Sequence, residues 1–339
     1  MRYKLLGRSG LRVSELCLGT MTFGEDWGWG ASREESAKIF DRFVEAGGNF
    51  IDTACNYTNG TSERYVGELV APERERFVLA TKYTLTARPD DPNGGGNHRK
   101  NMVQSLEASL KRLNTDYVDL FWLHMWDATT SVEEIMRAFD DLVRAGKVLY
   151  IGISDTPAWV VSQADTLAEL RGWTGFAALQ LPYSVASRDP ERDLLPMARA
   201  LGLSVTAWAV LGGGILTGKY NRETGEPRRY ESASERSRRL AEVLSETARE
   251  IGCTPAQAAI SWVRQQGRGE IIPILGARTE AQMVENLGAL EVTLGPEQLD
   301  RLDAANDIEL GFPHTFLDDE EVHELIFGKT LALIEGRRS

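Results

Sequence analysis

Eight short apolar runs, separated by amphipathic stretches, constrain the fold more than any other feature of the sequence. Apolar runs of this length predict buried strands, and strands that alternate with helices predict a parallel sheet. The predicted strands are Glu15–Leu18, Asn49–Asp52, Phe77–Lys82, Tyr117–His124, Val148–Ser154, Phe176–Leu181, Ser204–Trp208 and Ile271–Leu275.

The amphipathic stretches between these runs predict helices. Two of them begin with the spacing of a capping box, because Ser32 and Ser131 each stand three residues before a glutamate. Pro157 and Pro255 stand where a first helical turn begins, a position that suits proline. The predicted helices are Arg33–Glu45, Ser62–Val70, Lys100–Arg112, Val132–Arg144, Pro157–Leu170, Glu191–Leu201, Ser234–Ile251, Pro255–Gln266 and Glu280–Leu287.

Eight strand and helix pairs predict a closed (β/α)8 barrel, the TIM-barrel fold, rather than an open sheet. An open doubly wound sheet usually carries a Gly-x-Gly-x-x-Gly turn after its first strand, and no such turn follows any predicted strand here. Three segments lie outside the pairs: a hairpin at Tyr3–Val13, an extra C-terminal helix at Pro296–Ala305, and an apolar tail from Asp307 to Ser339 that we expect to pack near the barrel mouth. No linker divides the chain, so we expect one domain over residues 1–339.

The acidic composition narrows the possible partners. The 339 residues carry a formal net charge of −12, which disfavours binding to nucleic acid or to an anionic membrane. No run approaches the roughly 18 apolar residues that a membrane helix needs, and we identify no signal peptide. The three cysteines form no Cys-x-x-Cys pair, a usage that fits the reducing cytoplasm. We therefore expect a cytoplasmic protein.

Two glycine-rich segments invite a phosphate-binding interpretation. Gly213 to Lys219 match the first seven positions of the P-loop pattern, but Tyr220 replaces the Ser or Thr that holds Mg²⁺, and no helix is predicted to follow. The run from Gly94 to Gly96 lies between a strand and a helix, where a plain loop is the simpler interpretation. Neither segment predicts a nucleotide triphosphate site.

Four polar residues stand at or just beyond the carboxyl ends of three consecutive predicted strands. Asp52 and Tyr57 belong to the second strand and its loop, Lys82 ends the third, and His124 ends the fourth. Singly, each has an ordinary explanation, as a helix cap, a solvated side chain or a core residue. Because the active sites of (β/α)8 barrels lie at this end, we expect all four side chains to project into one cavity.

This combination suits proton transfer to a carbonyl oxygen. The ordinary pKa of a tyrosine hydroxyl is about 10. A neighbouring ammonium favours the phenolate, and a carboxylate beside that ammonium keeps it charged and in place. We expect Tyr57 to act as a general acid with Lys82 and Asp52 beside it, and His124 to direct the carbonyl by a hydrogen bond.

The chain resembles the aldo-keto reductases along nearly its whole length. The resemblance rests on the segments GRSGLRVSELCLGTMTFG, NFIDTACNY, VLATK, DLFWLH, YIGIS, ALQLPYS, LGGGILTGKY and IPILGARTEAQMVENL. Its most specific features are the Asp-x4-Tyr spacing and the strand-final lysine and histidine. The segments DWGWGAS and GISDTPAW are most similar to the bacterial branch related to aryl-alcohol dehydrogenases.

The resemblance implies NADPH-dependent reduction of aldehydes or ketones to alcohols, with a hydride from the nicotinamide and a proton from Tyr57. It implies that NADP(H) lies extended across the barrel mouth, with its nicotinamide stacked on Trp208 and the loop Ala209–Lys219 over its pyrophosphate. The implied cofactor-binding residues are Thr20, Met21, Asp52, Ser154, Asp155, Gln180, Trp208, Ala209, Leu211, Gly213, Lys219, Gly276, Arg278, Gln282, Glu285 and Asn286.

Three positions bear on the cofactor in particular. Arg278 follows the last strand and opens a helix, where a guanidinium suits the 2′-phosphate of NADP; a solvated surface arginine is the alternative. Ala209-Val210 stand where many of these reductases have Ser-Pro, so the loop lacks a hydroxyl and a fixed φ. Asp155 stands where Asn is common, and a carboxylate accepts a hydrogen bond from the carboxamide but donates none.

We expect an aromatic substrate wall from the loops after the first and fourth strands and from the tail. Aromatic pockets favour flat apolar ligands, so the expected partner is a small aromatic or medium aliphatic carbonyl compound. Each of these aromatic residues can equally serve the core or an interface. The expected wall residues are Phe23, Trp27, Trp29, Trp126, Phe312 and Phe316.

Two other functions compete with the reductase. A cofactor-bound regulatory subunit is compatible with the same residues, since some proteins that resemble these enzymes have a signalling role. A metal-dependent barrel hydrolase using Asp52 and His124 lacks a second nearby histidine, so we expect no metal.

Overall fold

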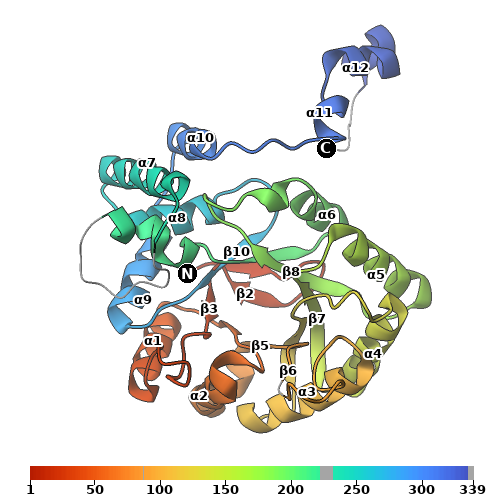
Figure 1. The fold of residues 1–339 in the computed structure, drawn as a ribbon, viewed down its shortest axis with the longest axis vertical. Coiled ribbons are helices and arrows are strands. Elements are labelled where there is room, and N and C mark those ends of the chain that lie inside the picture. Colours follow the sequence, from red (N-terminus) through yellow and green to blue (C-terminus); the bar gives the residue numbers. More distant parts are fainter. Residues whose placement is uncertain (87, 222–231, 335–339) are drawn as a thin grey trace.

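The structure is a computed structural model that describes residues 1–86, 88–221 and 232–334. Eight parallel strands close into a barrel in the order β10-β3-β4-β5-β6-β7-β8-β9, so that strands consecutive in the chain pair side by side (Figure 1). The barrel strands are β3 Cys17–Gly19, β4 Phe50–Asp52, β5 Val78–Tyr83, β6 Val118–Leu123, β7 Val148–Ser154, β8 Phe176–Pro182, β9 Ser204–Trp208 and β10 Ile271–Leu275. The predicted TIM-barrel fold is confirmed.

Helices surround the barrel, and α10 lies outside the eight repeating units, where the extra helix was predicted (Figure 1). The α-helices are α1 Arg33–Glu45, α2 Thr61–Val70, α3 Arg99–Leu113, α4 Val132–Arg144, α5 Ala158–Arg171, α6 Leu194–Leu201, α7 Glu235–Ile251, α8 Pro255–Arg264, α9 Glu280–Leu287, α10 Pro296–Ala305, α11 His314–Leu317 and α12 Glu320–Phe327. Short 3-10 segments are η1 Tyr57–Gly60, η2 Ala71–Arg76, η3 Asp189–Glu191, η4 Gly212–Thr217, η5 Lys219–Asn221, η6 Gly288–Glu291 and η7 Gly328–Leu333. Within the described ranges, none of these helices has the length and apolar character needed to cross a membrane.

The predicted hairpin closes the amino-terminal end of the barrel. Its strands are β1 Tyr3–Leu5 and β2 Arg12–Ser14, which pair antiparallel. Leu6 and Val13 are fully buried and join the apolar cluster inside the barrel. Lys4 Nζ donates a hydrogen bond to the carbonyl of the first residue of β10 at 3.0 Å. Among the described residues the hairpin covers this end, so we expect a ligand to enter at the opposite end, which we call the mouth.

The predicted capping serines do cap their helices, but their glutamate partners act elsewhere. The Ser32 and Ser131 hydroxyls accept hydrogen bonds from backbone N–H groups three residues on, each at 3.2 Å. Instead of completing capping boxes, the Glu35 carboxylate accepts from the N–H of Glu280 at 2.7 Å, and Glu134 accepts from a backbone N–H of α3 at 3.0 Å. These glutamates connect neighbouring helices, a role that local spacing does not reveal.

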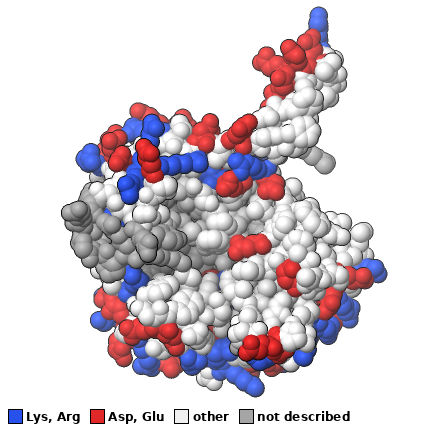
Figure 2. Space-filling model, in the orientation of Figure 1, with Lys and Arg blue, Asp and Glu red and all other residues white. Residues whose placement is uncertain are grey.

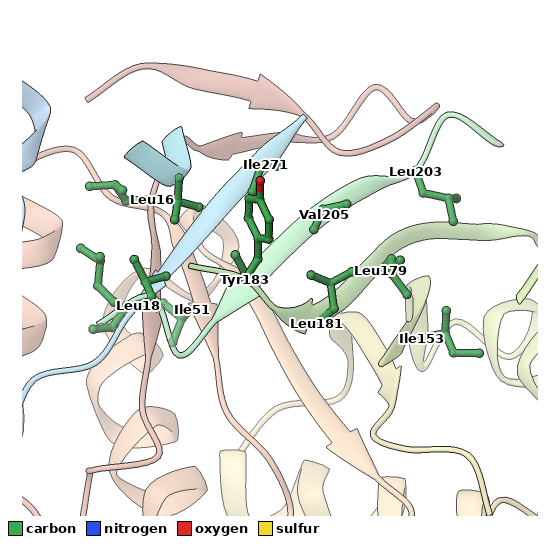
Figure 3. Packing of buried hydrophobic residues seen from close by; sticks show 14 of the residues in the cluster. Leu16, Leu18, Ile51, Ile153, Leu179, Leu181, Tyr183, Leu203, Val205 and Ile271 are labelled. Atoms are coloured by element: carbon green, nitrogen blue, oxygen red, sulfur yellow. The ribbon is translucent and has the colours of Figure 1, made fainter. Parts of the chain in front are cut away.

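Alternation along the strands produces two layers of core. Side chains that point outward from the barrel pack beneath the helices, and Figure 3 shows ten of them labelled around strands β3, β4 and β7 to β10. Side chains that point inward fill the barrel itself, with Trp122 the largest of them. Because inward and outward residues alternate with a period of two, neighbouring residues of one strand, such as Phe50 and Ile51 of β4, belong to different layers.

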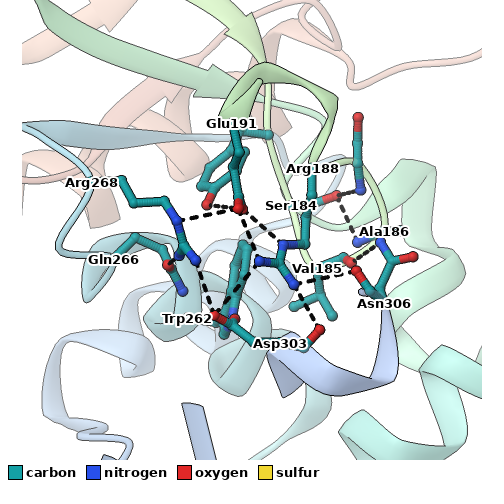
Figure 4. Close-up of polar contacts among 12 residues, drawn as sticks. Ser184, Val185, Ala186, Arg188, Glu191, Trp262, Gln266, Arg268, Asp303 and Asn306 are labelled. Carbon is teal, nitrogen blue, oxygen red and sulfur yellow. Dashed lines mark hydrogen bonds and ion pairs between the residues drawn. The ribbon is translucent and has the colours of Figure 1, made fainter. Parts of the chain in front are cut away.

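A buried polar network fixes α10 to the barrel. Glu191 ends η3 rather than starting a helix as predicted, so α6 begins later, at Leu194. The Glu191 carboxylate accepts hydrogen bonds from the Tyr183 hydroxyl and from Arg188 Nε, both at 2.8 Å (Figure 4). Arg188 also donates to the backbone carbonyl of Asp303 in α10 at 2.6 Å. A guanidinium that is almost fully buried thus has its charge balanced and its donors used.

The segment after α10 leaves the barrel, so the expectation that the tail packs near the mouth is wrong for residues 307–334. We call this segment the C-terminal arm; Figure 1 shows it projecting away from the barrel, and Figure 2 shows acidic side chains gathered on it. Arg192 Nε donates a hydrogen bond to the Glu309 carbonyl at 3.0 Å and so anchors the start of the arm. Beyond that point Phe312 is 83% exposed and Phe316 54% exposed. The expected tail residues 335–339 lie outside the described residues.

Candidate active site

Strand alternation brings three of the four predicted catalytic side chains to the mouth. Asp52, Lys82 and His124 each stand two residues beyond a side chain of the interior cluster and therefore face the same side as that side chain. The interior side chains that precede them by two positions are Phe50, Ala80 and Trp122. The same parity applies to the ends of β7, β8 and β9, so the barrel interior continues into a ring of polar and aromatic residues at the mouth.

Tyr57 reaches the same place from the loop after β4. It begins η1, where Thr58 and Asn59 adopt left-handed backbone conformations with φ of 45° and 54°. The Thr58 hydroxyl donates to the Phe23 carbonyl at 2.6 Å and accepts from the N–H of Ser62 at 3.0 Å. These contacts hold a sharp turn, which returns the tyrosine over the end of the strand.

The Lys82 ammonium joins the acidic residue to the tyrosine. Lys82 is fully buried, and its Nζ donates to the Asp52 carboxylate, to the Thr53 carbonyl at 2.8 Å and to the Tyr57 hydroxyl at 3.3 Å. Gln180 Nε2 donates to the second Asp52 oxygen at 3.2 Å. The predicted juxtaposition of Asp52, Tyr57 and Lys82 is thus present in the structure.

The charge on Lys82 is stabilised despite its burial. Burial alone would lower the pKa of the ammonium, but the Asp52 carboxylate and the Tyr57 hydroxyl together raise it above its ordinary value. Lys82 therefore remains protonated at neutral pH. A fixed positive charge next to a phenol is available to stabilise a phenolate that forms there.

The pKa of Tyr57 itself is raised, which corrects the expectation of an acidified phenol. Burial raises the pKa of Tyr57 more than the Lys82 ammonium lowers it, and the Asp52 carboxylate adds to the increase. The phenol is consequently protonated at neutral pH. That is the form from which a proton can be donated, and Lys82 acts by limiting the increase.

His124 stands across the mouth from Tyr57. The two ring centroids are 6.1 Å apart at an interplanar angle of 79°. Burial, together with the nearby Lys82 charge, lowers the pKa of His124 to about 3. The imidazole is therefore neutral, and a neutral imidazole donates one hydrogen bond. Its Nδ1 is buried without a hydrogen-bond partner in the part of the chain that the structure describes.

The residues expected at the nicotinamide form a second group on the next strands. Ser154 ends β7 and Gln180 lies near the end of β8, both buried. Trp208 ends β9 with 38% of its surface exposed, and its Nε1 donates to Asp155 Oδ1 at 3.3 Å. An exposed indole beside hydrogen-bonding groups fits a flat ring with a carboxamide.

Thr20 and Met21, expected against the same ring, follow β3. Thr20 is fully buried, and its hydroxyl donates to the Asp52 carbonyl at 3.1 Å and accepts from the Ser62 hydroxyl at 2.9 Å. Thr20 therefore holds the backbone of Asp52 in place. Met21 is half-buried beside it.

The loop expected over the pyrophosphate leaves the mouth directly after Trp208. Ala209 has a φ of 55°, an uncommon conformation for a residue with a side chain, while Val210 is buried. In η4, Gly213 has a φ of 66°. Leu211, just before η4, and Lys219, which begins η5, are half-buried. The loop therefore turns sharply at Ala209, and the buried Val210 side chain anchors it to the barrel.

The residues expected at the adenosine end lie together after β10. A Cβ added to Gly276 would meet no atom within 4 Å, so the space above this backbone is open. The Arg278 N–H donates to Gln282 Oε1 at 2.9 Å, and Asn286 Nδ2 donates to the Gly276 carbonyl at 3.2 Å. Glu285, one residue before Asn286, is exposed on α9. Free space next to the Gly276 backbone, with an arginine nearby, suits the phosphate end of a dinucleotide.

Three of the six expected substrate-wall residues do not line the mouth. Phe23 is fully buried in the outer core, because the chain bridges from Phe23 to Ala31 and turns the ring inward. Phe312 and Phe316 lie on the C-terminal arm, away from the barrel (Figure 1). The expectation that these three contact a substrate is wrong for this structure.

The other three aromatic residues remain candidates. Trp27 and Trp29 contact each other in the loop after β3, with centroids 5.8 Å apart. Trp126 packs edge-on against Trp159 at 5.5 Å, and its backbone N–H donates to the Asp155 carbonyl at 3.4 Å. Trp159, which sequence reasoning missed, is 62% exposed; its position just after a strand end and a proline was the available signal.

No group of three or more histidine, cysteine or acidic side chains is placed to bind a metal ion within residues 1–86, 88–221 and 232–334.

The chain matches the model of the aldo/keto reductase family over residues 15–307. It is 41% identical over 323 residues to a norsolorinic acid reductase of Aspergillus flavus, which covers 92% of this chain and 83% of that protein. It is 36% identical over 346 residues to an aryl-alcohol dehydrogenase [NADP(+)] of Phanerodontia chrysosporium, covering 94% and 89%. A putative aryl-alcohol dehydrogenase of Saccharomyces cerevisiae is 36% identical over 340 residues, covering 94% and 90%.

These relatives are fungal, so the expected placement in a bacterial branch is not supported. The resemblance to aryl-alcohol dehydrogenases agrees with their names. With the barrel, the site at its mouth and a match that spans most of the chain, this protein belongs to the aldo/keto reductase family and is an oxidoreductase that acts on carbonyl groups.

Proposed function

We propose that the protein reduces aromatic or medium aliphatic aldehydes and ketones with NADPH, and that Tyr57 donates the proton. The observation that carries the proposal is the Lys82 ammonium, which is shared between the Asp52 carboxylate and the Tyr57 hydroxyl, the latter at 3.3 Å, with the His124 ring facing the tyrosine. A protonated phenol, a buried cation and a neutral imidazole are the groups that such a reaction requires.

The cofactor, when bound, supplies a hydride to the carbonyl carbon. Trp208, Asp155 and Gln180 would hold the nicotinamide end, and Arg278 would hold the 2′-phosphate, which is the basis for proposing NADP(H). The Phanerodontia relative supports an aromatic substrate and NADP(H), because its name refers to an aryl alcohol and to NADP(+).

The protein residues carry the proton and the charge. As the carbonyl carbon accepts the hydride, its oxygen takes the proton of the Tyr57 hydroxyl, and an alcohol forms. The phenolate left behind lies beside the Lys82 ammonium, which stabilises it until solvent returns a proton. The neutral His124 donates a hydrogen bond to the same oxygen and fixes its direction.

The three free cysteines are consistent with work in a reducing cytoplasm, where we place the protein. We also propose that residues 1–339 form one domain and that the protein's partner is a small carbonyl compound.

Loss of nicotinamide absorbance in the presence of a panel of aldehydes and ketones tests this function. We expect sustained NADPH oxidation with aromatic aldehydes, and the same rate after treatment with a chelator. Tight NADPH binding without turnover of any compound in the panel would instead identify a regulatory subunit, and loss of turnover on chelation would identify a metal enzyme.

A further inference from the structure

A carboxylate stands at the mouth beside the candidate catalytic groups. Asp155 directly follows β7, and its side chain is exposed to the mouth. Its Oδ1 accepts a hydrogen bond from Trp208 Nε1 at 3.3 Å, and its backbone carbonyl accepts from the Trp126 N–H at 3.4 Å. Asp155 is therefore held at the mouth by the Trp208 indole at its carboxylate and by the Trp126 backbone at its carbonyl.

The backbone at this residue is held in an uncommon conformation. Asp155 has a φ of 42°, in the left-handed region, and its N–H donates to the Gln180 carbonyl at 3.3 Å. Left-handed residues other than glycine persist where the surroundings hold them. The backbone thus directs the side chain toward the mouth, where the hydrogen bond to Trp208 holds the carboxylate.

The negative charge of Asp155 acts on the candidate catalytic residues Tyr57 and Lys82. The Asp155 carboxylate contributes to raising the pKa of the Tyr57 phenol, and the Lys82 ammonium in turn attracts that carboxylate. The protein surrounds the side chain closely enough that burial raises the pKa of the Asp155 carboxyl, although the side chain is open to the mouth. Any ring that delivers a hydride to a carbonyl at Tyr57 must lie near both residues.

We propose that the negative charge of Asp155 lowers the reduction potential of the bound nicotinamide, because it favours the oxidised, positively charged ring over the reduced, neutral ring. The inference rests on the proposed function. A carboxylate attracts the cationic ring and leaves the neutral ring nearly unaffected. The carboxylate then makes bound NADPH a stronger hydride donor than it would be in the same site without that charge, so Asp155 biases the site toward carbonyl reduction.

Asp155→Asn separates the charge from the hydrogen bond. Asparagine keeps an Oδ1 that accepts from Trp208, and it tolerates the left-handed backbone well. We expect the Kd of NADP⁺ to rise about tenfold, while the Kd of NADPH changes by less than about twofold, because one full charge acts over a few ångströms in a partly screened site. A tenfold change in that ratio makes the potential of the bound couple about 30 mV more positive.

Titration of tryptophan fluorescence with NADP⁺ and with NADPH measures both constants without turnover. Asp41→Asn, on the outer helix α1, is the matched control for the loss of one negative charge, and its ratio of constants should equal that of the wild type. Asp155→Ala, which also loses the contact with Trp208, should weaken both forms of the cofactor.

Two results overturn the inference while leaving the proposed function intact. One is an unchanged ratio of constants in Asp155→Asn. The other is an equal weakening of NADP⁺ and NADPH in that variant, which would make Asp155 a support for Trp208 only. If the wild type binds neither form of the cofactor, the proposed function itself fails and the inference fails with it.

Discussion

Removing the Lys82 ammonium should damage stability and catalysis by two separable routes. Lys82→Met leaves the Asp52 carboxylate, which is 2% exposed, with a hydrogen bond from Gln180 Nε2 at 3.2 Å but without its cation. Breaking a buried ion pair by removing one partner costs about 3–5 kcal/mol, because the remaining charge is uncompensated. We expect a decrease of that size in the free energy of unfolding.

A second substitution distinguishes the two routes. Asp52→Asn in the Lys82→Met background removes the uncompensated charge, so most of the lost stability should return. Turnover should not return, because no cation remains beside the Tyr57 hydroxyl to stabilise the phenolate. We expect both variants to lose about 10²- to 10⁴-fold in carbonyl reduction, the usual contribution of a positioned acid.

Urea unfolding followed by tryptophan fluorescence gives the stability, and NADPH oxidation with an aromatic aldehyde gives the turnover. Lys147→Met is the control, since Lys147 forms a half-exposed pair with Glu107 and such pairs contribute about 0–1 kcal/mol. The reasoning is refuted if Lys82→Met is no less stable than this control, or if the double variant regains wild-type turnover.

Three further predictions concern the cofactor, the imidazole and the packing. Arg278→Ala should weaken NADPH far more than NADH in fluorescence titrations, and equal weakening would show that Arg278 does not contact the 2′-phosphate. The pKa of His124 is lowered to about 3 from an ordinary 6.5, so the unfolded chain binds the proton first as the pH falls. The free energy of unfolding should therefore decrease between about pH 6.5 and pH 3, by up to roughly 5 kcal/mol. His124→Gln should flatten this decrease in urea unfolding, and an unchanged pH profile would argue against a buried neutral imidazole. Gly67→Ala should lower the free energy of unfolding by about 1–3 kcal/mol, because its Cβ would lie 2.5 Å from the Leu113 carbonyl oxygen. The Cβ of Gly10→Ala meets nothing within 4 Å, so that variant should be near neutral. Thermal or urea unfolding measures both, and equal effects of the two would contradict the packing.

The barrel and the catalytic cluster were predictable because both follow from strand periodicity. Alternation with a period of two places Lys82 and His124 on the same side as the interior residues before them, and parallel strands end at a common edge. Only Tyr57 depends on a loop, and there the Asp-x4-Tyr spacing of the family supplied what periodicity does not.

The predictions that failed depend on contacts between distant segments. Whether Phe23 faces the mouth is decided by its bridge to Ala31 and by the Thr58 hydroxyl, neither of which a local pattern encodes. The arm carries the apolar side chains that the sequence shows, but composition does not reveal that Phe312 is left 83% exposed. The direction of the Tyr57 pKa shift depends on the balance between burial, which raises the pKa, and the Lys82 charge, which lowers it. The sequence reveals the neighbouring charge but not the extent of burial.

The central claim is that the Tyr57 hydroxyl gives its proton to the substrate, and Tyr57→Phe tests it most directly. Single-turnover oxidation of bound NADPH by an aromatic aldehyde should slow by at least about 10²-fold in this variant, while NADPH affinity stays within about twofold of the wild type. Tyr3→Phe, which removes a hydroxyl from the hairpin at the closed end, should react like the wild type. A Tyr57→Phe enzyme that reduces the aldehyde at the wild-type rate would contradict the account.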